Sequence, residues 1–324
     1  MEFDLPGTPR LRVAPPSPAA GSTPPPTRLP LVLTDTDAAL ALLARVSAEL
    51  RLVDERTPAL IDRIGRSLIS GRPRSPVMPV SALRLLQMTG AADVSFDDLA
   101  RHAVTDPAVA GSVMRYACSA AQAPGSRPAG IKEALIRLGV AGARQVAWDV
   151  AMSTKIARRG RFFPVMERIL RHGRTASALA GVLARELSIP PGPAALAGLL
   201  HAVGGMIVVD EMMAQRDLRV SDSVVFLAVR RLHAWAGGMV VKSIGIDNDI
   251  IVPLVTHHDA DLSQAPLMVR LLAFVDLISP SEPAQRAMPL PQAIERTALP
   301  LSEDAVRRRL GPITASVDEL AGRG

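Results

Sequence analysis

The sequence predicts an all-α fold, and three observations carry that prediction. Hydrophobic residues make up 48% of the 324 residues, so most of the chain must fold around a core. Aromatic residues make up only 3%, which leaves a core of Leu, Ala, Val, Ile and Met, and Ala and Leu favour helices. Apolar residues recur at helical spacing, and no alternating strand pattern stands out except at 206–209, which reads equally well as helix.

The N-terminal segment differs in composition from the rest. Residues 1–34 are rich in Pro, Ser, Gly and Arg, with consecutive prolines at 15–16 and 24–26. Proline removes backbone donors, and such a segment buries too little apolar surface to offset the entropy of ordering. We expect a disordered tail, with a polyproline docking motif as the alternative.

Residues 35–73 are expected to form an N-terminal helical extension. The run from Asp37 to about residue 52 has the composition of a helix. A second helix begins at Pro58, and its apolar side chains recur at helical spacing at Leu60, Ile61, Ile64 and Leu68. The prolines and Gly71 that follow predict a short linker at 71–76.

The main domain is expected at 74–279, followed by a C-terminal extension at 280–324. Ser95 and Asp98 form a capping-box pattern before a short helix that ends near residue 103. Asp106 followed by Pro107 marks another helix start, and Gly139 is placed to end the helix that begins at 131. Further helices are expected at 141–158, 163–187, 193–213, 220–242, 248–259 and 264–279.

Charge and cysteine content narrow the class of protein. The formal net charge is +6, almost entirely from arginine, because the chain contains three lysines. A basic balance can indicate nucleic acid, but no stripe of interleaved aromatic and basic residues appears, so a nucleic-acid partner is not favoured. Arg307, Arg308 and Arg309 form the densest cationic cluster, which is typical of a solvated helix face. The single cysteine, Cys118, excludes an intramolecular disulfide and a thiolate zinc cage.

No targeting or membrane segment is expected. The N-terminus is acidic and broken by proline, which is wrong for a signal peptide. The longest apolar stretch, at 194–209, falls short of a membrane span. We therefore expect a cytoplasmic protein.

Three segments in the first half of the main domain resemble one family. They are PVSALRLLQM from Pro79, SFDDLARHAVTDPAVAGSVMRYACSA from Ser95, and GIKEALIRLGVAGARQVAWDVAM from Gly130. In this order and with these gaps they are similar to the HDOD domain, and the resemblance extends over roughly residues 74–275. Cys118 departs from the pattern, because the family usually has Asn before the Ser-Ala pair.

The histidines of the second half resemble those of the HD superfamily of metal-dependent phosphohydrolases, of which HDOD is a divergent and generally regulatory branch. That superfamily carries the ligand series His, His-Asp, His, His-His, Asp. Here the matching positions are His172, His201, His233, His257, His258 and Asp276. The resemblance implies a shared polar pocket, whereas His102 lies outside the series and is expected at a helix end. For any single one of these histidines, a structural role is the commoner explanation.

Two departures argue against catalysis. In active superfamily members the aspartate of the His-Asp pair bridges the metals, and here that position is Ala202. Gly205 stands where the superfamily often has Lys. No Gly-Tyr-Pro signature follows the paired histidines, so hydrolysis of cyclic-di-GMP has no motif support. No cofactor is expected, although His172, His201 and Asp276 would suit a single weakly bound divalent metal if they converge.

The sequence therefore favours a non-catalytic signal-transduction module that binds a protein partner or a nucleotide. The alternative is a metal-dependent phosphohydrolase with an unorthodox His/Asp site that lacks the HD aspartate. A nucleic-acid-associated regulator is the third hypothesis. Glycines 204 and 205, which lie within an expected helix, predict close helix packing or a helix break.

Overall fold

The computed structural model describes residues 29–310 apart from 53–54, 56, 71–78, 92, 121–127, 157–160, 215–219, 244, 260 and 280–286. Every regular element in these ranges is a helix, which confirms the all-α prediction. A short 3-10 helix, η1, spans Leu31–Leu33, and residues 303–310 are also helical. The α-helices are α1 Thr36–Arg51, α2 Thr57–Ile69, α3 Val80–Met88, α4 Phe96–Ala103, α5 Pro107–Ala120, α6 Ile131–Ile156, α7 Phe163–Glu186, α8 Pro191–Leu200, α9 Val203–Met213, α10 Asp222–Ser243, α11 Asn248–Thr256, α12 Leu267–Ile278 and α13 Leu290–Thr297.

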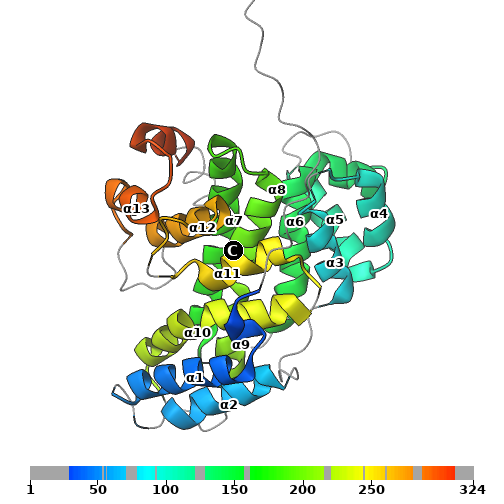
Figure 1. Cartoon of the computed structure of the whole chain (residues 1–324). Coiled ribbons are helices and arrows are strands. Elements are labelled where there is room, and N and C mark those ends of the chain that lie inside the picture. The colour runs from blue at the N-terminus through cyan, green and yellow to red at the C-terminus, as the bar shows by residue number, and fades with distance from the viewer. Residues whose placement is uncertain are drawn as a thin grey trace, which may run out of the picture.

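The helices are arranged around the central α7–α12 group. Figure 1 shows α3–α6 on one side of this group and α1 and α2 below it, beside α9 and α10. The N-terminal hairpin α1–α2 therefore packs directly on the half of the domain that carries the histidines. Its apolar face, which includes Leu43, Val46, Leu60 and Ile64, is part of the main core.

The N-terminal boundary lies earlier than the sequence indicates. The expected tail at 1–28 and the linker at 71–76 lie outside the described residues, but 29–33 are placed against the domain. Leu33 is buried, and the carbonyls of Val32 and Leu33 accept hydrogen bonds from Trp235 Nε1 and Lys242 Nζ of α10. The expectation of disorder up to residue 34 is therefore wrong for this last stretch. Asp35 then caps α1 by accepting from the backbone N–H groups of residues 37 and 38.

Two expected helix boundaries are informative. Gly139 adopts a φ of +66°, a conformation that L side chains rarely take, and it divides α6 into two helical segments. This confirms that Gly139 ends the helix beginning at 131. The single helix expected at 193–213 is wrong, because the chain breaks at His201 and Ala202 into α8 and α9.

The break lets α8 and α9 each approach a different helix at backbone distance. A Cβ added to Gly198 in α8 would lie 2.5 Å from the carbonyl oxygen of Ala176 in α7. A Cβ added to Gly204 in α9 would lie 2.5 Å from the amide nitrogen of Gly237 in α10, and closer still to the carbonyl oxygen of His233. The close packing predicted from residues 204 and 205 is thus confirmed, and it holds α7, α8, α9 and α10 together where the histidines lie.

Two stretches, Pro191–Met213 and Asp222–Ser243, are apolar enough and long enough to cross a membrane by composition alone. The most apolar window of the first is 89% buried and that of the second is 67% buried. The first is also broken at His201 and Ala202. Both stretches pack as core helices of the helical assembly.

Candidate metal centre

Six side chains from five helical elements meet at one place. His172 lies in the middle of α7, and His201 follows the last residue of α8. His233 comes from α10, His257 and His258 follow α11, and Asp276 lies near the end of α12. The structure brings together all the residues of the superfamily-like series, although they span 105 positions of sequence. His102 lies elsewhere, one residue before the end of α4, where its Nε2 is 2.8 Å from the carbonyl oxygen of Ser81.

The first triad consists of His172, His201 and Asp276. The Nε2 atoms of His172 and His201 are 2.6 Å apart. Asp276 Oδ1 lies 3.2 Å from His172 Nε2 and 3.9 Å from His201 Nε2. Two imidazoles and a carboxylate in this arrangement form a ligand set that zinc commonly uses.

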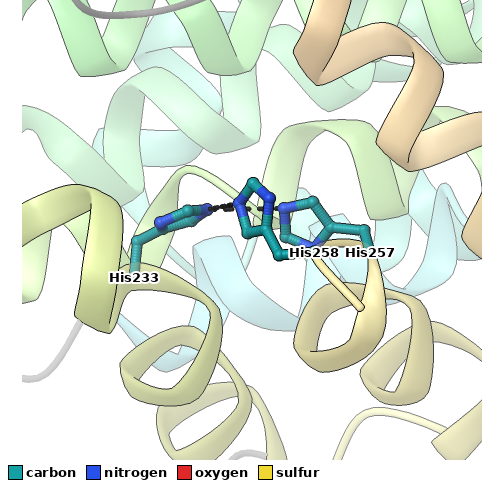
Figure 2. A group of neighbouring side chains, drawn as sticks. All are labelled: His233, His257 and His258. Atoms are coloured by element: carbon teal, nitrogen blue, oxygen red, sulfur yellow. Dashed lines mark hydrogen bonds between the residues drawn. The ribbon is translucent and has the colours of Figure 1, made fainter. Parts of the chain in front are cut away.

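The second triad consists of His233, His257 and His258 (Figure 2). His233 Nε2 is 3.4 Å from His257 Nε2 and 3.1 Å from His258 Nε2. Asp276 reaches toward this group as well, because its Oδ2 lies 3.7 Å from His258 Nε2. Asp276 therefore stands between the two triads, with one oxygen near each.

Backbone carbonyls fix the tautomers of three histidines. His201 Nδ1 donates to Gly198 O at 2.6 Å, and His233 Nδ1 donates to Val229 O at 3.0 Å. His257 Nδ1 donates to Leu254 O at 2.9 Å. A carbonyl only accepts, so each Nδ1 carries the proton, and a neutral ring then has a bare lone pair at Nε2.

These lone pairs face one another at the centre. His233 Nε2 and His257 Nε2 lie 3.4 Å apart and neither has a proton to share, so their contact is not a hydrogen bond. A cation placed among the Nε2 atoms would convert this mutual repulsion into coordination. In metal sites, a histidine ligand commonly donates its other ring N–H to a group such as a backbone carbonyl, and this hydrogen bond orients the ring. The donor set therefore fits a divalent metal.

His172 is the weak member of the first triad. Its Nδ1 is buried and has no hydrogen-bond partner in the described part of the chain. The protein therefore does not orient this ring through its second nitrogen, and such support normally strengthens a ligand by one to two orders of magnitude, roughly 10- to 100-fold. A metal held here is expected to bind weakly.

Burial keeps the inner histidines neutral. Desolvation by burial is the main reason that the pKa of His201 falls to about 3 and that of His233 to about 4. Burial also lowers the pKa of His257 well below its ordinary value. For Asp276, burial by itself would raise the pKa, but the hydrogen bond from His172 and electrostatic interactions with the histidines hold it well below the ordinary value. Neutral imidazoles around an ionised carboxylate are ready to bind a cation.

The same shifts predict acid sensitivity of the metal-free protein. Below pH 6.5 the unfolded chain binds protons at His201 and His233 that the folded chain excludes, so stability falls as pH falls toward their folded pKa values. Each of these histidines is expected to cost about 1.4 kcal/mol of unfolding free energy per pH unit. Urea unfolding at pH 7, 6 and 5 in the presence of a chelator measures the slope. His201→Leu should make the slope shallower, and a pH-independent midpoint between pH 7 and 5 would contradict the account.

The centre opens on a cavity of about 1090 Å³. His258 is the most accessible ligand, with 42% of its side chain exposed. Ala202, only 3% exposed, lines the cavity beside His201 and presents a methyl group there. On the far side, α1 forms a wall of the cavity through Ala38, Leu42 and Arg45. No pattern in the sequence indicates this role for α1, because it depends on how the hairpin docks.

The comparisons with known proteins identify the fold and the family. The structure is similar to that of a candidate metal-dependent phosphohydrolase from Shewanella amazonensis, with a TM-score of 0.57, 21% identity, and coverage of 78% of this chain and 95% of that one. It is also similar to a candidate signal transduction protein from Marinobacter aquaeolei, with a TM-score of 0.58, 16% identity, and coverage of 82% of this chain and 65% of that one. At these identities the likeness shows the fold.

A curated relative, ribonuclease Y of Thermus thermophilus, is 26% identical over 130 residues, which cover 40% of this chain and 19% of that protein. The chain therefore matches about a fifth of the length of this relative. The model of the HDOD domain matches residues 75–258, which is more than half of the chain. The chain belongs to the HDOD domain family, within the HD phosphohydrolase superfamily.

Proposed function

We propose that the chain is a non-catalytic signal-transduction module whose histidine centre holds one divalent cation as a structural element. The observation that carries the proposal is Ala202, which stands at the position of the bridging carboxylate while the other ligands are present. The centre keeps the donors that bind a metal and lacks the group that joins two metals. Signalling would then proceed through binding of a protein partner, with a nucleotide as the alternative ligand.

Electrostatics explain why the missing carboxylate matters. In two-metal enzyme sites in general, the two ions lie about 3.5–4 Å apart. At about 4 Å and an effective dielectric constant near 20, two divalent cations repel each other by roughly 16 kcal/mol. A bridging carboxylate offsets part of this repulsion, and a methyl group offsets none. We therefore expect one cation per chain, in the triad that contains Asp276, because its carboxylate supplies negative charge.

The surface charges support a protein partner rather than nucleic acid. Many of the arginines in the described ranges pair with carboxylates, including Arg307 with Glu303 and Arg309 with Glu186 from the cluster noted in the sequence. Pairing of this kind lowers the positive potential that phosphate backbones require. Neither nucleic acid nor a membrane forms part of the proposal, and the location proposed is cytoplasmic.

The alternative is a metal-dependent phosphohydrolase, which the convergence of six ligand residues favours. One assay separates the two functions. Purified chain loaded with Zn²⁺, Mn²⁺ or Fe²⁺ is incubated with bis(p-nitrophenyl) phosphate, and release of p-nitrophenol is followed. The proposal predicts the same rate for the wild type and His201→Ala. A wild-type rate at least tenfold above that of His201→Ala would establish catalysis at the centre and overturn the proposal.

A further inference from the structure

Four arginines from three helices line the cavity above the histidine centre. Arg45 comes from α1, Arg230 and Arg231 from α10, and Arg296 from the last turn of α13. Arg231 pairs with Glu49 of α1, which also lines the cavity. For Arg45, Arg230 and Arg296, the described part of the chain contains no ion pair. Three unpaired guanidinium groups therefore face one cavity.

The acidic groups of the lining do not cancel this charge. Besides Glu49, the cavity contains Asp259 and Asp276. Asp276 belongs to the first triad and would neutralise part of a bound cation. Asp259 adds one negative charge to a lining that contains four arginines. With a divalent cation in place, the cavity is strongly positive and suited to an anion.

Much of the remaining lining is apolar, and the cavity is large. This part of the lining includes Ala38, Leu42 and Val46 of α1 and Phe226 and Trp235 of α10. A volume of about 1090 Å³ is slightly larger than the range for small-molecule sites, roughly 300–1000 Å³. The cavity therefore combines an apolar wall with cationic groups, and a molecule that carries a ring and a phosphate would satisfy both.

We propose that this cavity binds a nucleoside phosphate, with its phosphates on Arg45, Arg230 and Arg296 and its ring against the apolar wall of α1 and α10. Guanidinium groups suit phosphate because they offer several donors in a fixed fork. Arg45 lies outside the matched family segment of residues 75–258, so this ligand would fasten the N-terminal hairpin to the domain. The inference rests on the proposed function and names the ligand through which the module would receive its signal.

Calorimetric titration of the full, zinc-loaded and desalted chain with ADP, inorganic phosphate and adenosine tests the inference. ADP is expected to bind at least tenfold more tightly than adenosine, because only ADP contacts the arginines. If inorganic phosphate binds as tightly as ADP, the ring adds nothing to the affinity, and a site for a nucleoside phosphate is contradicted. ADP affinity no greater than that of adenosine would overturn the role of the arginines.

Arg45→Gln and Arg296→Gln should each weaken ADP binding about tenfold, a change of about 1.4 kcal/mol. Arg51→Gln is the matched control, because Arg51 lies on the same helix and is absent from the cavity lining, so its affinity should equal that of the wild type. Hydrogen exchange of residues 36–51 should slow when ADP binds, which a purely local site would not cause. Unchanged ADP affinity in both cavity variants would overturn the inference.

The outcome for the inference is separable from that for the proposed function. Metal content measured on the same samples reports on the histidine centre. Chain that holds zinc but does not prefer ADP contradicts the inference and leaves the proposed function intact. The opposite result is a wild type that retains no metal but binds ADP, and an Arg45→Gln variant that does not bind it. This result would support the inference and contradict the proposed cation.

Discussion

Gly204→Ala is expected to destabilise the protein by about 3 kcal/mol or more, the largest effect of any single methyl group in the helical core. A Cβ at this position would lie 2.5 Å from the amide nitrogen of Gly237 and closer still to the carbonyl oxygen of His233. Both neighbours are backbone atoms, so no side chain can rotate away, and α9 must separate from α10. Because α10 carries His233, the same change should also weaken metal binding. Urea unfolding of the metal-free protein measures the loss.

Two glycines provide controls for this prediction. Gly111→Ala in α5 meets nothing within 4 Å and should stabilise the protein by up to about 1 kcal/mol through helix propensity. Gly205→Ala meets Val229 Cγ1 at 3.0 Å, a side-chain atom that can shift, so its cost should be smaller than that of Gly204→Ala. A Gly204→Ala variant as stable as the wild type would mean that α9 and α10 do not cross at backbone distance.

His201→Ala is expected to abolish the stabilisation that a divalent cation gives. At a free zinc concentration of 100 times the dissociation constant, the wild type should gain about 2.7 kcal/mol of unfolding free energy. The variant loses one of three ligands in the triad that contains Asp276 and should gain nothing measurable. Thermal unfolding with and without zinc, in parallel with metal content after desalting, measures both quantities.

His102→Ala serves as the matched control, since His102 lies outside both triads. Its zinc-dependent gain should equal that of the wild type, even if its baseline stability falls through loss of the contact with Ser81. His233→Ala, in the second triad, should retain most of the gain. Equal loss in His201→Ala and His233→Ala would place the cation between the triads instead of in the first one.

Much of the fold was predictable because helix signals are local. The capping residue Ser95 and the left-handed Gly139 both mark helix ends that the sequence indicates. The break at His201 was not predictable from propensity, because it depends on α8 and α9 packing against different helices. Proline content led to the expectation of disorder through residue 34, whereas Leu33 is held by tertiary contacts with α10.

The site was predictable in its membership and not in its chemistry. Resemblance to the superfamily identified the five histidines and Asp276, because their order along the chain is distinctive. The proton positions could not be read from sequence, since they follow from carbonyls such as Gly198 O and Val229 O that each ring reaches. Arg45 could not be identified either, because its place at the cavity depends on the docking of the N-terminal hairpin.

The most direct test of the account is the number of metal ions bound by the wild type and by Ala202→Asp. Ala202 is the N-cap residue of α9 and has right-handed helical φ and ψ angles, which aspartate can also adopt. Native mass spectrometry of zinc-loaded, desalted chain should show one ion in the wild type and two in Ala202→Asp, because the restored carboxylate joins the triads. Two ions in the wild type, or none in either protein, would contradict a centre that Ala202 limits to a single cation.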